Sequence, residues 1–160
     1  MHSILASATA QLEICAMVDG SSAFDPASAI LSGMNFERLL WVQAGGQLEK
    51  AVKAADLILH GGGFGVVVLD LCGISSHRLL QIPLSYWYRF RRAVEKTPTT
   101  FVVTSAIPVA KSCAAMQLEI KRKKSLWRGQ APFRLLAGAE LEAGSRKPCM
   151  HENTLLRAAV

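Results

Sequence analysis

The stretch Val66-Val67-Val68-Leu69-Asp70 decides the fold of this chain. Three β-branched residues followed by a leucine favour a strand, and a continuous aliphatic run is typical of a parallel strand that is covered on both faces. The run ends in an acid, and an acid at the end of such a strand commonly orients magnesium beside a nucleotide triphosphate. No G-x-x-x-x-G-K-[ST] loop, which would hold the phosphates, occurs before it. The sequence therefore contains only half of a nucleotide-binding apparatus.

The segments around this strand alternate between the apolar patterns of strands and of helices. Further strands are expected at 13–18, 39–42 and 99–105, and helices at 1–11, 46–60 and 85–96. Another helix is expected to begin at Asp25-Pro26, because Asp is a favourable N-cap and Pro fits the first helical position. Gly61 is placed to cap the helix over 46–60. This alternation predicts an α/β fold with a mostly parallel sheet and helices on both of its faces.

Beyond Ser112 the pattern changes to one that is typical of antiparallel strands. Apolar residues alternate with polar ones at Met116, Leu118 and Ile120. A second extended run covers 133–141, and both segments are expected to have one face in water.

Length and composition set the expected domain organisation. The 160 residues are 51% hydrophobic, which is enough for one domain with a core. We expect an incomplete core domain over 1–143. The segment 144–160 contains Arg, Lys and Pro and is expected to be a disordered tail.

Charge and cysteine content narrow the class of protein. The net charge of +6 and the pI of about 9.4 suit a protein that contacts polyanions. The cysteines form no C-x-x-C pair, so neither a zinc site nor a disulfide framework is indicated. No apolar run approaches the ~18 residues of a membrane span, and no Lys or Arg precedes the signal-peptidase-like Ala6-Ser7-Ala8. A cytoplasmic protein without membrane contact is expected.

Several motifs of moderate specificity follow one another in a characteristic order. They are 16–26 (AMVDGSSAFDP), 39–43 (LLWVQ), the helix over 46–60 and the strand 66–70. In this order they resemble the core of the bacterial RecA recombinase family, and more closely the short RecA-like proteins of the ImuA type, accessories of damage-induced mutagenesis. The similarity extends from about residue 1 to about residue 140. It implies a RecA-like sheet and descent from an ATPase that uses ATP and magnesium.

The resemblance assigns family roles to individual positions. Asp70 matches the acid that orients magnesium; the alternative is that it caps the turn after the strand. Asp19 matches a strand-end acid beside the family's catalytic glutamate, which itself falls on Ser21, and a serine cannot act as a general base toward water. The glutamine that senses the terminal phosphate falls near Thr104 or Ser105, whose hydroxyl is too short to reach as far. Asp70, Asp19 and Ser105 are therefore expected to form a vestigial nucleotide and magnesium site without a catalytic residue.

In the family, a strand and the phosphate loop come before the helix in which Met1 lies. Neither occurs in this sequence, so ATP and magnesium are expected to bind weakly or not at all, and ATPase activity is not expected. The absent strand belongs in the interior of the family's sheet, so its neighbours are expected to leave backbone groups unpaired. A truncated gene product, a misplaced start, or a partner that fills the gap would each account for this arrangement.

Basic residues interleaved with aromatic ones occur in two places. Arg89 and Arg92 lie in the 85–96 helix, whereas Lys121, Arg122, Lys123 and Lys124 precede Trp127. This pattern suits phosphate contact and base stacking on single-stranded DNA. The alternatives are a solvated face for the helix and an ordinary charged hairpin for the lysine-rich run.

Two functions remain open at this point. The first is a RecA-like protein of DNA repair and recombination, acting in the SOS response or in damage tolerance, that binds DNA and has weakened or lost ATP binding. The second is a non-enzymatic interaction module that binds a subunit of a translesion polymerase. The first predicts single-stranded DNA as the partner, and the second predicts a DNA polymerase accessory protein.

Overall fold

The computed structural model describes residues 1–130, 132–147 and 154–159. It divides into two compact units, Met1–Cys113 and Ala114–Val160. The division at 113/114 differs from the single domain over 1–143 that the sequence predicted. Strands also occupy 144–147 and 154–159, within the region expected to be a disordered tail, whereas 148–153 and 160 lie outside the described residues.

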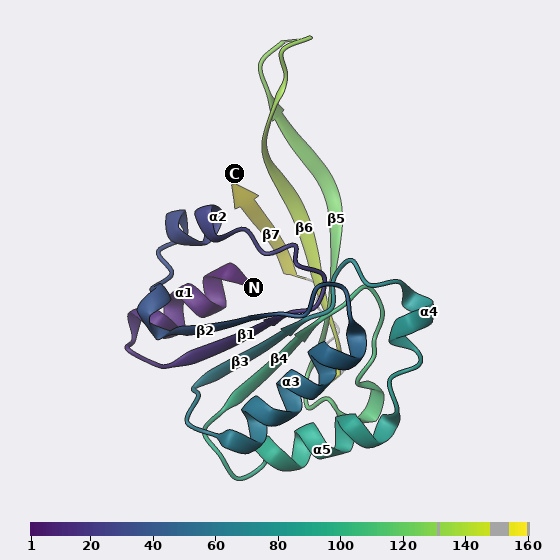
Figure 1. Cartoon of the computed structure of the whole chain (residues 1–160). Helices are drawn as coiled ribbons and strands as arrows, with labels where there is room; N and C mark the ends of the chain where they lie inside the picture. The colour runs from purple at the N-terminus through teal and green to yellow at the C-terminus, as the bar shows by residue number, and fades with distance from the viewer. Residues whose placement is uncertain (131, 148–153, 160) are drawn as a thin grey trace. The chain divides into compact units, whose positions relative to one another are not determined.

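The first unit contains a four-stranded parallel sheet. Its strands are β1 (Cys15–Asp19), β2 (Leu39–Gln43), β3 (Val66–Asp70) and β4 (Thr100–Thr104). They lie in the order β2-β1-β3-β4, and every neighbouring pair is parallel (Figure 1). All positions of β1 and β3 are buried, which confirms that the valine-rich run is an interior strand.

Helices cover both faces of this sheet, which confirms the predicted α/β class. They are α1 (His2–Ala10), α2 (Pro26–Leu31), α3 (Leu48–Gly61), α4 (Ser76–Leu79) and α5 (Leu84–Val94), with short 3₁₀ turns at Phe36–Arg38 and Lys111–Cys113. The helices α1 and α2 lie over one face and α3 and α5 over the other (Figure 1). One core joins Leu5 of α1 to Met17 and Val68. The opposite core joins α3 and α5 to Val18 and Leu69.

Two predicted helix ends can be checked in detail. Asp25 caps α2 as expected, since its carboxylate accepts the backbone N–H groups of Ala27 at 3.1 Å and Ser28 at 3.2 Å. The end of α3 lies one residue later than predicted, because Gly62, with φ of 68°, follows the last helical residue Gly61. No helix among the described residues is both long and apolar enough to cross a membrane.

The expected gap in the interior of the sheet is absent, so this prediction was wrong. Val66 to Asp70 of β3 pair directly with Thr100 to Thr104 of β4 on one side and with Cys15 to Asp19 of β1 on the other. Both interior strands therefore have hydrogen-bonded neighbours on each side. The backbone of the two interior strands is therefore paired on both sides, which removes the reason to expect a partner between them, while β2 and β4 are the edge strands of the sheet.

The second unit contains a separate antiparallel sheet. Its strands are β5 (Gln117–Arg128), β6 (Leu135–Lys147) and β7 (Thr154–Ala159), in the order β5-β6-β7. Antiparallel strands were predicted here, but β5 continues well past Ile120 through the basic run. The alternation of apolar residues stops at that point, so the sequence pattern did not mark the rest of the strand.

The close contact between the ends of β1 and β3 gives a stability prediction. The N–H of Gly20 donates to the carbonyl oxygen of Asp70 at 2.8 Å, and a Cβ at Gly20 would lie 2.6 Å from that oxygen. Gly20→Ala is expected to lower the free energy of unfolding in urea by about 1–3 kcal/mol, because the strand ends must move apart.

The control for this experiment is Gly61→Ala in the last turn of α3, where a Cβ meets nothing within 4 Å. Since Ala is favoured over Gly in helices, this variant should be as stable as the wild type or more stable by up to about 1 kcal/mol. Equal stability of the Gly20 variant and the wild type would contradict the tight approach of the two strands.

Candidate functional site

The carboxyl ends of β1 and β3 form the natural ligand-binding position of this sheet. The chain leaves β1 toward α2 on one face and leaves β3 toward α5 on the other (Figure 1). Open α/β sheets usually bind ligands where the connections of neighbouring strands diverge in this way. Asp19 and Asp70 are register partners at this point. The structure thus brings together the two acids that the sequence analysis selected.

Asp19 is fully buried and both of its carboxylate oxygens are used within its own loop. Oδ1 accepts the N–H of Ala23 at 3.2 Å, and Oδ2 accepts the N–H of Phe24 at 3.0 Å. The carboxylate therefore organises the turn that leads from β1 to α2. A buried acid whose oxygens are both satisfied by backbone amides stabilises the local structure without any ligand.

Asp70 is also engaged by neighbouring protein groups. Its Oδ1 accepts the N–H of Cys72 at 3.0 Å and the hydroxyl of Thr104 at 2.6 Å. The first contact is the turn cap that the sequence analysis kept as the alternative role. The second contact joins the ends of β3 and β4. The sequence analysis named Thr104 only as one of two positions that match the family's phosphate-sensing glutamine, and did not predict its bond to Asp70.

Ser105 and Ser21 complete this edge. The hydroxyl of Ser105 donates to the carbonyl oxygen of Ile107 at 2.6 Å, so it holds its own loop. The hydroxyl of Ser21 is buried and has no hydrogen-bond partner among the described residues. A Cβ placed on Gly73 would lie 3.3 Å from it, so the loops after β1 and β3 are packed together there. Within residues 1–130, 132–147 and 154–159, no cluster of three or more side chains suited to a metal ion occurs.

Cys72 is a residue of this edge that sequence reasoning missed. Its position two residues after Asp70 could have shown from the sequence that it lies at this edge. The residue is exposed, yet partial burial of the thiol and, after that, the nearby Asp70 carboxylate raise the pKa of the Cys72 thiol above its ordinary value. Both effects disfavour the negatively charged thiolate.

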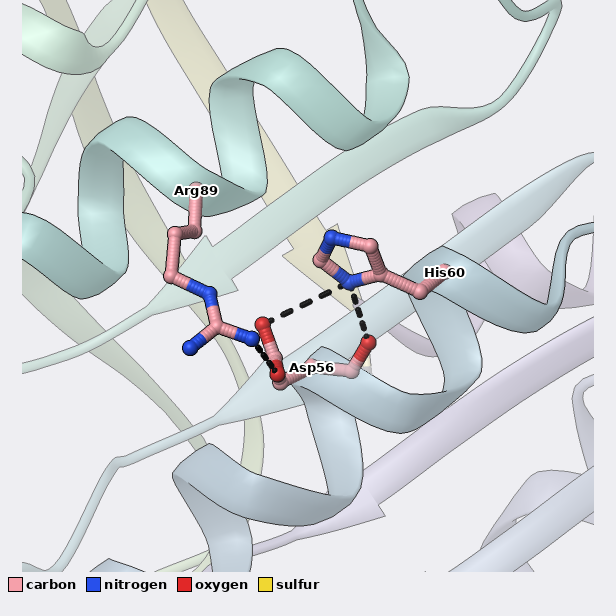
Figure 2. Close-up of polar contacts among 3 residues, drawn as sticks. All are labelled: Asp56, His60 and Arg89. Carbon is pink, nitrogen blue, oxygen red and sulfur yellow. Dashed lines mark hydrogen bonds and ion pairs between the residues drawn. The ribbon is translucent and has the colours of Figure 1, made fainter.

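The two arginines selected on α5 have different surroundings. Arg89 lies 2.6 Å from Oδ2 of Asp56 on α3 (Figure 2). Its guanidinium carbon also stands over the ring of Tyr86, 5.8 Å from the ring centroid. Nδ1 of His60 lies 2.8 Å from the main-chain oxygen of Asp56 and 3.5 Å from its Oδ1. Arg89 therefore links two helices, whereas Arg92 is exposed and makes no ion pair with a described residue.

The basic run lies on β5, where Lys121, Arg122, Lys123 and Lys124 are all exposed. Nζ of Lys121 lies 3.5 Å from a carboxylate oxygen of Glu119. The pairing with β6 shifts between Arg122 and Lys124, so Lys123 has no register partner. Trp127, 58% exposed, follows on the same strand. Four cations and an aromatic ring are thus available to solvent along one strand.

Comparisons with known proteins add no assignment, since no family model matches the chain and no curated protein is significantly similar to it.

The different roles of the two arginines on α5 give a matched pair of variants. Arg89→Ala leaves Asp56, whose side chain is 14% exposed, without its closest cation. The free energy of unfolding is expected to fall by about 1–3 kcal/mol. Arg92→Ala should change it by less than about 0.5 kcal/mol. Denaturant unfolding of both variants checks this, and equal effects would show that the Arg89 contact contributes nothing specific.

The raised pKa of Cys72 gives a prediction about its reactivity. At pH 8 the thiol should react with iodoacetamide more slowly than an ordinary exposed cysteine, because less thiolate is present. Asp70→Asn removes the nearby negative charge and should accelerate the reaction. Peptide mapping by mass spectrometry gives the rate for each cysteine, and the buried Cys113 is the control for general unfolding. An unchanged Cys72 rate in the variant would contradict the electrostatic influence of Asp70.

Proposed function

We propose that this chain is a RecA-like accessory protein of DNA repair that binds single-stranded DNA through strand β5 and does not hydrolyse ATP. The observation that carries the proposal is the uninterrupted exposure of Lys121 to Lys124 on this strand, with the exposed Trp127 beside them. Proteins that bind single strands usually combine two features: cations along the nucleic-acid backbone, and aromatic rings on which the bases stack.

The distribution of ion pairs supports this assignment. Among the described residues, no ion pair involves Arg122, Lys123 or Lys124. Lys124 stands opposite Glu140 on β6, whereas Arg122 stands opposite Leu141 and Lys123 has no register partner, so Arg122 and Lys123 have no acid directly across the strand. The chain as a whole carries a net charge of +6. Unpaired cations release counterions from DNA when they contact phosphates, which gives an affinity that falls steeply with salt.

The contacts at the carboxyl edge of the parallel sheet support the loss of nucleotide chemistry. Both oxygens of Asp19 and one oxygen of Asp70 accept hydrogen bonds from the protein itself. A magnesium ion would have to compete with these backbone donors for Asp19. The contacts of Asp19 therefore support weakened magnesium binding at this edge, and Ser21 provides no base for hydrolysis. The role of the edge is then to hold the sheet together.

An interaction module remains the second candidate, because β5 also presents apolar residues to solvent. Leu118 is 58% and Ile120 is 60% exposed. Exposed apolar side chains that lie together are typical of protein contacts, which supports a protein partner. The family resemblance suggests an accessory subunit of a translesion polymerase for this role.

The proposal is tested with a fluorescein-labelled oligothymidylate and fluorescence anisotropy over a range of salt concentrations. The wild type should bind with an affinity that falls as salt rises. The double variant Arg122→Ala/Lys123→Ala should bind several-fold more weakly. Its salt dependence should be shallower, by about 0.7 in log K against log[salt] for each phosphate contact removed.

The matched control is Lys50→Ala/Lys53→Ala, which removes two exposed cations from α3. It has the same net charge as the test variant, so a difference between the two assigns binding to β5 and not to overall charge. Equal losses in both variants, or no salt-dependent binding by the wild type, would refute DNA binding by β5 and leave the interaction module as the better explanation.

A further inference from the structure

An open depression of about 370 Å³ lies on the hairpin formed by β5 and β6. Its lining residues are Lys124, Ser125, Leu126, Trp127, Gly129 and Arg134. All of them belong to the second unit, so the depression is a feature of one compact body. Its volume is within the roughly 300–1,000 Å³ that is usual for small-molecule sites.

The shape of the depression depends on a glycine. Gly129 has φ of +94°, and a Cβ there would lie 2.7 Å from the carbonyl oxygen of Phe133. Only glycine combines this backbone conformation with so close an approach of the two chain segments. Gly129 and Phe133 are therefore close together, and Gly129 lines the depression with Trp127 and Arg134.

Trp127, the aromatic residue that lines the depression, does not belong to either hydrophobic core. Trp127 is 58% exposed, whereas Trp87 is 3% exposed and packs against Phe90. Trp41 packs in the other core, with its ring 5.1 Å from that of Phe24. Two of the tryptophans thus have structural contacts, and Trp127 presents its indole to solvent beside cations.

The two charged residues that line the depression are both cations. The side chains of Lys124 and Arg134 are exposed, and among the described residues neither side chain makes an ion pair or a side-chain hydrogen bond. No acidic residue is among the lining residues. An aromatic surface with two cations and no acid suits a ligand that is planar, aromatic and negatively charged.

We infer that this depression binds one nucleotide unit of a single-stranded nucleic acid, with the base stacked on Trp127 and the neighbouring phosphates at Lys124 and Arg134. The inference rests on the proposed function and deepens it, because it separates contact with bases from contact with phosphates. Arg122 and Lys123 contact the phosphates of the nucleic acid along β5. The depression at the hairpin binds one of its bases.

The test compares two labelled probes of equal length, an oligothymidylate and an oligonucleotide with abasic residues at its central positions. Both carry the same phosphates, so a difference in affinity measures the contribution of bases. The wild type should bind the oligothymidylate more tightly. Trp127→Ala should weaken that binding by roughly 5- to 150-fold and should bind the two probes equally. Trp127→Phe should retain most of the preference, because it keeps an aromatic face.

Tyr88→Ala is the matched control, because Tyr88 is an exposed aromatic residue on α5 at 49% exposure. It should keep both the affinity and the preference for bases. Arg134→Ala should weaken binding of both probes by the same factor, as expected for a phosphate contact.

The outcomes distinguish the inferred base site from the proposed binding of single-stranded DNA by β5. A wild type that binds both probes equally, or a Trp127→Ala variant that keeps the preference for bases, overturns the base site and leaves DNA binding by β5 intact. No binding of either probe by the wild type overturns both. Loss of the preference in Trp127→Ala, but not in Tyr88→Ala, supports the site.

Discussion

The pairing of β1 with β3 is the constraint on which the rest of the first unit depends. Each strand has a parallel partner on both sides, and every one of its positions is buried. At the carboxyl end the N–H of Gly20 continues the ladder by donating to the carbonyl of Asp70 at 2.8 Å. A side chain at Gly20 would separate the strands there. The position of both acids, and of the loops that follow them, is set by this one junction.

The junction also explains why acids persist at an edge whose nucleotide chemistry we propose to be lost. Asp19 fastens the turn after β1 with two backbone N–H groups, and Asp70 ties β3 to β4 through Thr104. Removing either acid would leave its donors without a partner, which costs about 1–3 kcal/mol for a buried donor such as the N–H of Phe24 and less for the partly exposed ones. That is a large share of the stability of a small domain. The carboxylates are therefore needed whether or not any ligand is bound, and their presence alone is weak evidence for a nucleotide.

The sequence predicted the interior of the fold better than its edges. The aliphatic run at 66–70 and the alternation around it were sufficient for the parallel sheet, because burial on both faces restricts composition strongly. Parallel register then brought Asp19 and Asp70 together without further information. The direct pairing of β3 with β4 was missed because the strand order was inferred from the sheet of the RecA family, which has a further strand in its interior. The contact of Arg89 with Asp56 joins residues 33 positions apart, and local patterns do not encode such contacts. The length of β5 was missed because charged residues give no apolar alternation.

Strand pairing, and not composition, decides which cations of β5 can reach a ligand. In a regular strand, alternation would place Lys121 and Lys123 on one face and Arg122 and Lys124 on the other. The shift in pairing between Arg122 and Lys124 breaks this alternation, and Lys124 stands opposite Glu140 while Arg122 stands opposite Leu141. Lys121 already pairs with Glu119, which also binds Arg146 at 2.8 Å. The charge available to a polyanion is therefore concentrated at Arg122, Lys123 and the hairpin beyond them, toward the exposed ring of Trp127. Under the proposed function, phosphates would contact Arg122 and Lys123 and a base would stack on Trp127, so a bound single strand would follow β5 toward the hairpin.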